Sequence, residues 1–280
     1  MKRLIALVIS ALFYTAYLFI RNIFQLLNKR IPTQVICLTY HSITEERRSQ
    51  FIKQMAELTK VGTPVSGDIK KPSADGLHYI IVTFDDGFEN IIKNALPAMH
   101  ETNIPATIFV TTGYMGRKPG WITDPKHPSA CEFLMTEEQL KNLNFDQVTI
   151  GSHTVSHPHL SDLDTSALKK ELSDSKSKLE ELLQRKVTLI ALPYGSIDME
   201  NTQHFKEAGY ERVFLNIPTF PATLNDRYFV GRIDTSPDDW MVEYKLKLRG
   251  AYQWLPWAIA AKRSIKTCFQ GLLHNRGVSS

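Results

Sequence analysis

The chain has 280 residues, of which 43% are hydrophobic and 22% charged, which is the composition of a globular protein rather than of a disordered or low-complexity one. Its 33 basic and 29 acidic residues are spread along the chain without a basic tail, so the sequence predicts no nucleic-acid partner. Cys37, Cys131 and Cys268 are odd in number and far apart, which argues against a disulfide framework and against a thiolate metal site.

The N-terminus carries an uncharged run of 17 residues, 4–20, between Arg3 and Arg21. That length is at the short end of the roughly 17 to 25 residues that a membrane-spanning helix needs. A cleaved secretory signal is the alternative, but the run ends in the bulky residues 17–20 without a small-x-small cleavage pattern. The sequence therefore predicts a transmembrane or signal-anchor helix within residues 1–30, and a secreted protein if that segment is cleaved. Basic residues on both sides of the run leave its orientation open.

Short apolar runs alternate along the chain with segments of helical spacing. Continuous apolar runs are typical of strands in parallel sheets that are covered on both faces. The predicted strands are 34–39, 79–84, 106–110, 148–151, 187–191, 212–215 and 228–233. The predicted helices are 90–102, with Pro97 as a kink, 166–184 and 201–208. This alternation predicts an α/β fold with a parallel sheet, either open or closed into a barrel.

The chain beyond the predicted anchor divides into a main domain, 31–243, and a C-terminal segment, 244–280, which is rich in Lys, Arg, Leu and Trp. No internal repeat or low-complexity linker divides the main domain further. Trp254 and Trp257 suit a membrane interface, and a helix that packs back onto the main domain is the equal alternative.

Two adjacent carboxylates, Asp85 and Asp86, follow the predicted strand 79–84 directly. Like charges at the end of a buried strand repel each other and lose solvation unless a cation or a proton relieves them. An ordinary Asp-Asp-Gly turn is the alternative interpretation of the same residues.

A second motif places His153 and His157 four residues apart, so the spacing predicts that both imidazoles lie on one face of a helical turn. Imidazoles in this arrangement suit a zinc ion, and two histidines with one carboxylate leave positions open for water and substrate, as in catalytic zinc sites. His41, Asp85 and Tyr194 also follow predicted strands, and barrel enzymes concentrate their chemistry at the carboxyl ends of the strands.

Together, Thr-Phe-Asp-Asp-Gly at 83–87 and Ser-His-Thr-x-x-His-Pro at 152–158 resemble the motifs of the polysaccharide deacetylase family, also called carbohydrate esterase family four or NodB-homology proteins. The resemblance runs from about residue 36 to residue 257, and it implies a distorted (β/α) barrel of about seven parallel strands. It also implies that Asp85 is the general base. Asp86, with the two histidines of the second motif, would bind one divalent metal ion, with zinc expected first and cobalt or nickel as alternatives.

Two further segments are similar to family motifs. Leu-Pro-Tyr-Gly at 192–195 resembles the family's Pro-Tyr motif, which implies that the backbone N–H of Tyr194, after Pro193, stabilises the oxyanion. Leu-Thr-Tyr-His at 38–41 resembles the family branch whose general acid lies near the N-terminus, which implies that His41 is the general acid.

The sequence departs from the family pattern at two points. Ala191 stands where the family usually has an arginine, and Asp239 and Trp240 match only the second half of an Asp-x-x-Asp-Trp motif. Arg232 and Asp234, near the end of the predicted strand 228–233, are the candidates for orienting the base or contacting substrate. An ordinary surface position is the alternative for both.

The resemblance implies hydrolysis of N-acetyl groups from amino sugars in a glycan, with release of acetate, by a membrane-anchored protein whose catalytic domain faces the periplasm or the cell surface. A carbohydrate-binding protein that has lost turnover is one alternative, motivated by Ala191. A second alternative is a deacetylase of a lipid-linked sugar. Such an enzyme would have the same site residues and differ only in its cleft.

Overall fold

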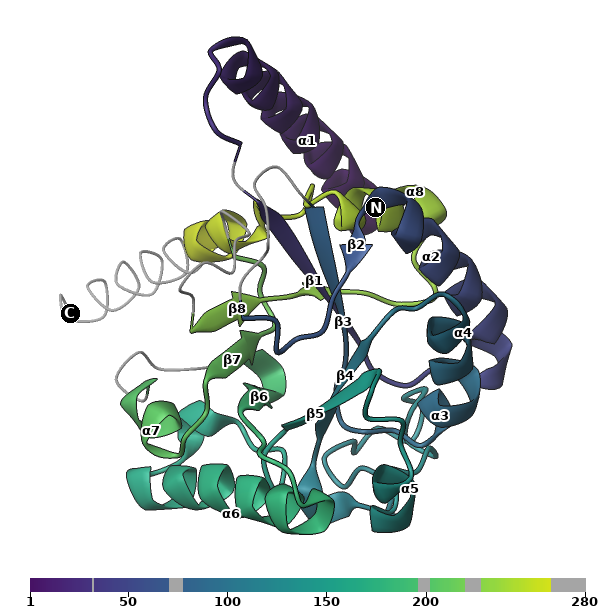
Figure 1. The fold of residues 1–280 in the computed structure, drawn as a ribbon, viewed down its shortest axis with the longest axis vertical. Coiled ribbons are helices and arrows are strands. Elements are labelled where there is room, and N and C mark those ends of the chain that lie inside the picture. Colours follow the sequence, from purple (N-terminus) through teal and green to yellow (C-terminus); the bar gives the residue numbers. More distant parts are fainter. Residues whose placement is uncertain (32, 71–77, 196–201, 220–227, 263–280) are drawn as a thin grey trace, which may run out of the picture.

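A curved, fully parallel sheet forms the centre of the molecule, and helices cover its outside (Figure 1). The computed structural model describes residues 1–262 except 32, 71–77, 196–201 and 220–227. The sheet runs in the order β8-β7-β6-β5-β4-β3-β1-β9, and β2 pairs beside β3. The strands are β1 (Gln34–Tyr40), β2 (Thr63–Pro64), β3 (His78–Phe84), β4 (Ala106–Val110), β5 (Val148–Ser152), β6 (Leu189–Ala191), β7 (Arg212–Leu215), β8 (Phe229–Gly231) and β9 (Ile233–Asp234).

The barrel is closed by one stretch of chain, because β8 and β9 follow each other directly and occupy the two ends of the sheet. Val230 of β8 is in register with Phe214 of β7, whereas Ile233 of β9 is in register with Leu38 of β1. Arg232 lies between the two strands at this seam. The predicted α/β fold with a distorted barrel of parallel strands is therefore confirmed, and the predicted strand 228–233 is divided into two short strands that pair with different neighbours.

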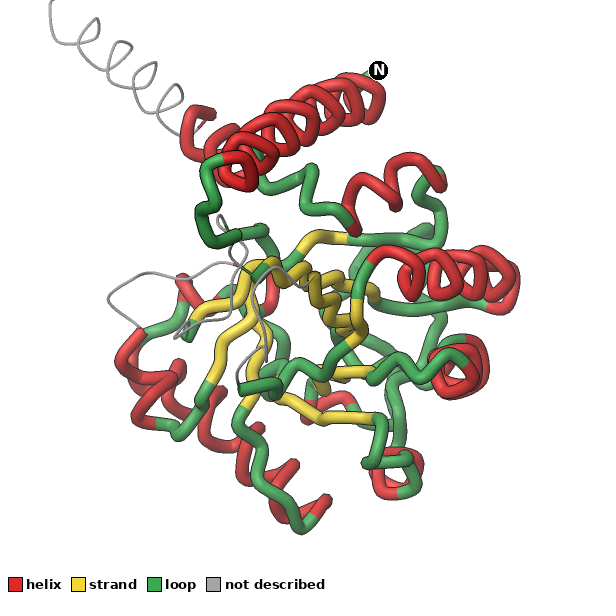
Figure 2. Tube along the Cα trace, turned by 45° about the horizontal axis from the view of Figure 1, so that its top comes forward, coloured by secondary structure: helices red, strands yellow, loops and turns green. Residues whose placement is uncertain are grey.

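Helices surround the strands when the molecule is viewed along the barrel (Figure 2). The predicted helix 90–102 is divided at Ala95, where φ is −120°, because Pro97 has no N–H to continue the helical hydrogen bonds and stands at the start of the second piece. The sequence did not predict α2, whose apolar stripe is short. The helices are α1 (Lys2–Leu26), α2 (Arg48–Val61), α3 (Asn90–Asn94), α4 (Leu96–Glu101), α5 (Glu137–Lys141), α6 (Thr165–Leu183), α7 (Thr202–Glu207) and α8 (Met241–Leu248).

Neighbouring residues of each central strand are buried on opposite faces of the sheet. In β1, Val35 and Cys37 belong to a cluster inside the barrel, whereas Ile36 and Leu38 belong to the larger cluster beneath the helices. Burial on both faces is why these strands are continuous apolar runs. The barrel interior is filled by side chains, so a ligand can only reach the strand ends.

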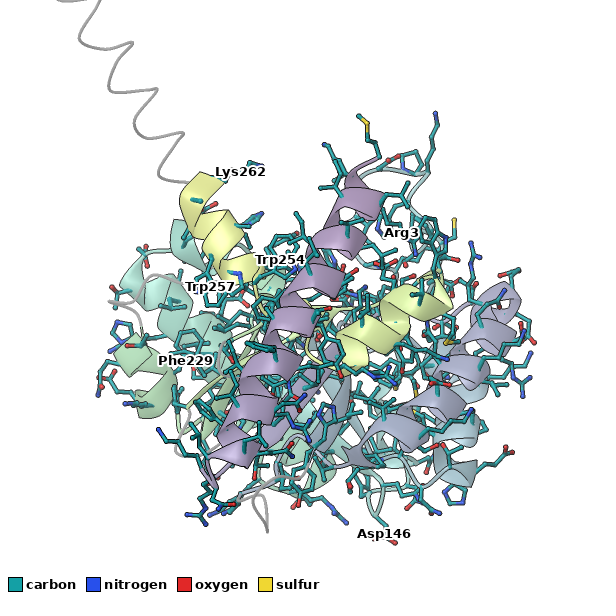
Figure 3. The ribbon with its side chains drawn as sticks, turned by 90° about the horizontal axis from the view of Figure 1, so that it is seen from above. Arg3, Asp146, Phe229, Trp254, Trp257 and Lys262 are labelled. Carbon is teal, nitrogen blue, oxygen red and sulfur yellow. The ribbon has the colours of Figure 1, made fainter. Side chains whose placement is uncertain are left out.

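The N-terminal helix α1 lies on the outside of the barrel, beside α8 and the helical residues 255–262 (Figure 3). It has 25 residues, a mean hydropathy of 2.0 over its most apolar window and 6% of that window buried, so its length and composition suffice to cross a membrane. The predicted boundary between 243 and 244 falls within α8. Residues 263–280 of the predicted C-terminal segment lie outside the described residues, and the three-part division of the chain stays a prediction.

Candidate metal and catalytic site

The predicted site residues follow parallel strands and lie at the carboxyl-terminal edge of the barrel. Asp85 and Asp86 follow β3, His153 follows β5, His41 follows β1 and Tyr194 lies just after β6. The backbone pairing continues past the strand ends, because the N–H of Asp85 donates to Tyr40 O and the N–H of His153 donates to Val110 O, each over 2.9 Å. These bonds fix the backbone from which the side chains project.

Asp86, His153 and His157 meet at one point. The Oδ1 atom of Asp86 lies 3.5 Å from Nε2 of His153 and 3.4 Å from Nε2 of His157, and all three side chains are buried. Zinc bonds of ~2.0 to 2.1 Å in tetrahedral geometry place neighbouring ligand atoms about 3.4 Å apart. The spacing of these donor atoms therefore fits a single divalent cation.

The hydrogen bonds of the cluster also fit a cation. Nδ1 of His153 donates to the carbonyl of Ala191 over 2.9 Å, which keeps the proton on Nδ1 and leaves the lone pair of Nε2 directed at Asp86. Oδ1 of Asp86 is buried and accepts a hydrogen bond from none of the described residues. Burial, with His153 beside it, lowers the pKa of His157 to about 2, so its imidazole is neutral and able to ligate a metal.

The predicted helical turn through the two histidines was wrong, because this segment is a loop with Thr154 at φ 67° and His157 at φ 59°. Glu171 of α6 accepts hydrogen bonds from the backbone N–H groups of Val155 and Ser156, and Thr154 Oγ1 accepts one from the N–H of His157. These side chains accept hydrogen bonds from N–H groups that would be paired with backbone carbonyls in a helix. The loop nevertheless brings both Nε2 atoms to the same carboxylate.

Positive φ angles gather at the site. Asp86 has φ 71° and Tyr194 has φ 57°, in addition to the two loop residues described above. Each non-glycine residue in this region costs of order 1–3 kcal/mol. At Asp86 the positive φ belongs to the turn directly after β3, which directs the carboxylate across the strand ends. The conformational cost is therefore incurred at a residue that would bind the metal.

Asp85 forms a buried ion pair with Arg232, the residue at the barrel seam. Nη1 of Arg232 donates to Oδ1 over 2.6 Å and Nη2 donates to Oδ2 over 2.8 Å, and both side chains are fully buried. Burial alone raises the pKa of Asp85, but the guanidinium of Arg232, with smaller contributions from His153 and His41, outweighs it and holds the pKa at about 2. The carboxylate is therefore ionised at neutral pH.

Asp239 and Trp240 have partners other than Asp85. Oδ2 of Asp239 accepts a hydrogen bond from Lys247 over 2.7 Å, and the guanidinium of Arg3 lies 4.5 Å from the ring centre of Trp240. Within the described residues, these two candidates contact the N-terminal helix and α8. The arginine that pairs with the first aspartate comes from the seam, not from the position of the missing family arginine.

A cleft of about 380 Å³ opens beside the cluster. His41 and Asp234 are exposed and line this cleft together with the buried Asp86. Its other polar lining residues include Arg47 and Asp238, which form an ion pair. A lining with many hydrogen-bonding groups suits a polar ligand.

Aromatic rings enclose the second histidine of the cluster. The ring of Trp121 stacks on His157 with centres 4.3 Å apart and an angle of 13°, and Tyr114 packs edge-on against Trp121. Tyr194 meets the imidazole of His157 edge-on at 4.8 Å and stacks on His159 at 3.8 Å. Sequence reasoning did not identify Trp121, because a single tryptophan in a loop has no motif that marks it.

Comparison with known proteins gives one family match. A sequence model described as "Polysaccharide deacetylase" matches residues 74–213, half of the chain. YxkH of Bacillus subtilis (strain 168) is 26% identical over 220 residues, which are 74% of this chain and 73% of that protein. A poly-beta-1,6-N-acetyl-D-glucosamine N-deacetylase of Staphylococcus aureus (strain MRSA252) is 28% identical over 167 residues, 56% of this chain and 54% of that enzyme.

Solved structures share the fold. IcaB from Ammonifex degensii superposes with a TM-score of 0.61 at 23% identity, over 79% of this chain and 99% of that chain. The deacetylase PplD of Streptococcus pyogenes has a TM-score of 0.57 at 19% identity, over 75% of this chain and 93% of that one. At these identities the likeness concerns the arrangement of strands and helices.

Proposed function

Because this chain belongs to the polysaccharide deacetylase family, whose members are hydrolases acting on amide bonds, we propose that it removes N-acetyl groups from amino sugars of a glycan and releases acetate. The observation that carries this proposal is the meeting of Asp86, His153 and His157 beside an ionised Asp85. Amide hydrolysis requires a nucleophile, an oxyanion stabiliser and a proton donor, and each requirement has a candidate at this edge of the barrel.

The three clustered residues would hold one divalent cation. Two imidazoles and one carboxylate are a donor set typical of catalytic zinc sites, and cobalt and nickel accept the same donors. Such a cation supplies Lewis acidity toward the acetyl carbonyl and lowers the pKa of water.

The remaining steps use the chain's own groups. Asp85, kept ionised by Arg232, accepts the proton of the attacking water, and His41 at the cleft wall donates a proton to the departing amine. The backbone N–H of Tyr194, after the buried Pro193, donates to the oxyanion. Each acid or base of this kind contributes about 10²- to 10⁴-fold in rate, and an oxyanion donor about 10²- to 10³-fold.

The substrate proposed first is a polymer of β-1,6-linked N-acetylglucosamine, because that is the substrate named for the relative from S. aureus. The polar cleft supports a carbohydrate ligand. The apolar helix α1 supports attachment to a membrane, with the catalytic domain on the extracytoplasmic side where such polymers accumulate. A deacetylase of lipid-linked sugars remains the second candidate, and a substrate panel separates the two.

The test is acetate release by the full-length protein from N-acetylglucosamine oligomers. We expect dialysis against a chelator to abolish release, and zinc, cobalt or nickel to restore it. Asp85→Asn is expected to lower kcat by about 10²- to 10⁴-fold while the metal stays bound. Asp174→Asn, an exposed carboxylate of α6 paired with Lys170, is the matched control and should match the wild type.

Two outcomes would count against this function. Acetate release that survives complete removal of metal would exclude the metal-dependent mechanism. Binding of the oligomers without any release, at every metal tested, would instead indicate a carbohydrate-binding protein that has lost turnover.

We also expect Trp121 to hold His157 in position. Trp121→Ala removes the ring stacked on the imidazole and is expected to weaken metal affinity by about 10- to 100-fold, whereas Trp121→Phe keeps a flat ring and most of the affinity. Titration with a competing metal indicator measures the change. Trp240→Ala serves as the control, since its ring contacts Arg3. Unchanged affinity in Trp121→Ala would show that the stack does not position the ligand.

A further inference from the structure

The face of α1 that lies against the domain carries five polar or amphipathic residues. Arg3, Ser10, Tyr14, Tyr17 and Arg21 are spaced by three, four or seven residues, which places them on one side of a helix. Ser10 is fully buried, and its Oγ accepts a hydrogen bond from Trp254 Nε1 over 2.9 Å. Tyr14 packs against the main hydrophobic core. The helix therefore attaches to the domain through its polar face.

The opposite face of α1 is apolar and exposed. Its large side chains include Leu4, Ile5, Val8, Leu12 and Phe19, each more than half exposed. A soluble protein places such a face inward and the polar face outward. The reversed arrangement of α1 leaves a long apolar ridge on the surface of the molecule.

Neighbouring segments extend this ridge. Trp240 and Val242 at the start of α8 are exposed beside α1, and the exposed Trp257 packs against Phe13 with ring centres 6.0 Å apart (Figure 3). Among the described residues, nearly all exposed large apolar side chains lie on or beside α1; the others are Ile52, Phe133 and Tyr194. Tryptophan is enriched where a protein meets the headgroup region of a bilayer.

The N-terminal end of α1 is held at the domain. Nε of Arg3 lies 2.6 Å from Oε2 of Glu243, and its Nη2 donates to the carbonyl of Asp238 over 2.9 Å. The other end joins β1 through the short segment 27–33. A helix of 25 residues is about 37 Å long, so while it crosses a bilayer its ends lie on opposite sides. If α1 crossed the bilayer, Arg3 would lie on the side opposite the domain and could not contact Glu243.

We propose that α1 lies in the plane of one membrane leaflet, with its polar face on the catalytic domain and its apolar face in the acyl-chain boundary. The partner is a lipid surface, bound by an in-plane helix rather than a spanning one. This inference rests on the membrane attachment proposed above and is independent of the hydrolytic reaction. Asp238, which contacts Arg3, also lines the cleft, so this arrangement would hold the cleft close to the membrane surface.

The test asks whether the N-terminus and the domain lie on the same side of the membrane. It uses the full-length protein in sealed vesicles. One variant carries Lys2→Cys with Cys131→Ser and Cys268→Ser; the matched variant carries only Cys268→Ser and keeps the exposed Cys131 as the domain reporter. We expect a membrane-impermeant maleimide to label Lys2→Cys and Cys131 from the same side at comparable rates. The in-plane arrangement would be overturned if Lys2→Cys were labelled only after detergent opens the vesicles, while Cys131 of the matched variant is labelled without detergent.

A second measurement uses the proximity of positions 3 and 243. A short bis-maleimide is expected to join Arg3→Cys to Glu243→Cys within membranes, while Thr15→Cys on the outward face should not join to Glu243→Cys. Absence of the first product overturns the proposal. Recovery of the uncleaved protein in the soluble fraction would refute membrane attachment altogether. Acetate release measured on the same vesicles reports on the hydrolytic function separately.

Discussion

Replacing Asp86 by asparagine is expected to abolish metal binding and acetate release without destabilising the metal-free protein. Asparagine keeps the size of the side chain and tolerates the positive φ at this position, but it removes the charge that binds the cation. The cation contributes several kcal/mol to the transition state, so kcat should fall by at least about 10²- to 10³-fold. Metal analysis, kinetics and thermal unfolding measure the three effects.

The stability of the metal-free variant follows from the environment of Asp86. Its carboxylate is buried and faces the imidazoles of His153 and His157, and burial raises the pKa of Asp86. An amide in its place buries no charge, so the melting temperature of metal-free Asp86→Asn should equal or exceed that of the metal-free wild type. A variant that still binds one equivalent of metal would contradict the assigned ligand set. Asp174→Asn on the surface of α6 again provides the control.

Replacing Arg232 by methionine is expected to cost both stability and activity. It leaves the buried Asp85 without a partner, a change that typically costs about 3–5 kcal/mol. Burial then raises the pKa of Asp85, so the carboxyl is protonated over more of the pH range and kcat should fall by about 10²- to 10⁴-fold. Arg232→Lys keeps the charge but loses the paired hydrogen bonds, and an intermediate effect is expected. Urea unfolding and kinetics measure these changes.

The pH dependence of the same variant has a definite sign. The pKa of Asp85 in the folded protein, about 2, is below the ~3.9 of a free aspartate, so the ion pair stabilises the wild type above about pH 4 and this contribution is lost as the pH falls toward 2. The stability difference between wild type and Arg232→Met should shrink over that interval. The acid limb of the variant's rate profile should move to higher pH.

A double variant separates the ion pair from general damage to the seam. Adding Asp85→Asn to Arg232→Met removes the unpaired charge, so the double variant should be more stable than Arg232→Met alone. Additive losses of stability would mean that Arg232 acts through packing at the seam and not through Asp85.

The strands and the residues at their ends could be predicted from the sequence, because burial on both faces of the sheet produces continuous apolar runs. Asp85, Asp86 and His153 were identified because they interrupt that pattern where each strand ends. The path between His153 and His157 was not predicted correctly, since it depends on hydrogen bonds that its backbone donates to Glu171, a residue of a later helix.

Contacts between distant segments were the least predictable part of the site. From the sequence, Arg232 and Asp234 were equal candidates for orienting the base. Only the closure of the barrel brings Arg232 against Asp85. The stack of Trp121 on His157 is likewise a product of the fold. The N-terminal run was identified by its hydropathy, but only the structure shows that the side of the helix with Ser10 faces the domain.

The position of Arg232 between β8 and β9 places the partner of Asp85 in the last strands of the sheet. The three donor residues are complete once His157 has been made, but the counter-ion of Asp85 arrives only with the final segment of the sheet. Without residues 229–234 the chain lacks the guanidinium that keeps the carboxyl of Asp85 ionised when the fold buries it. The proposed base is therefore paired only when β8 and β9 join the sheet, so the segment that closes the barrel also completes the site.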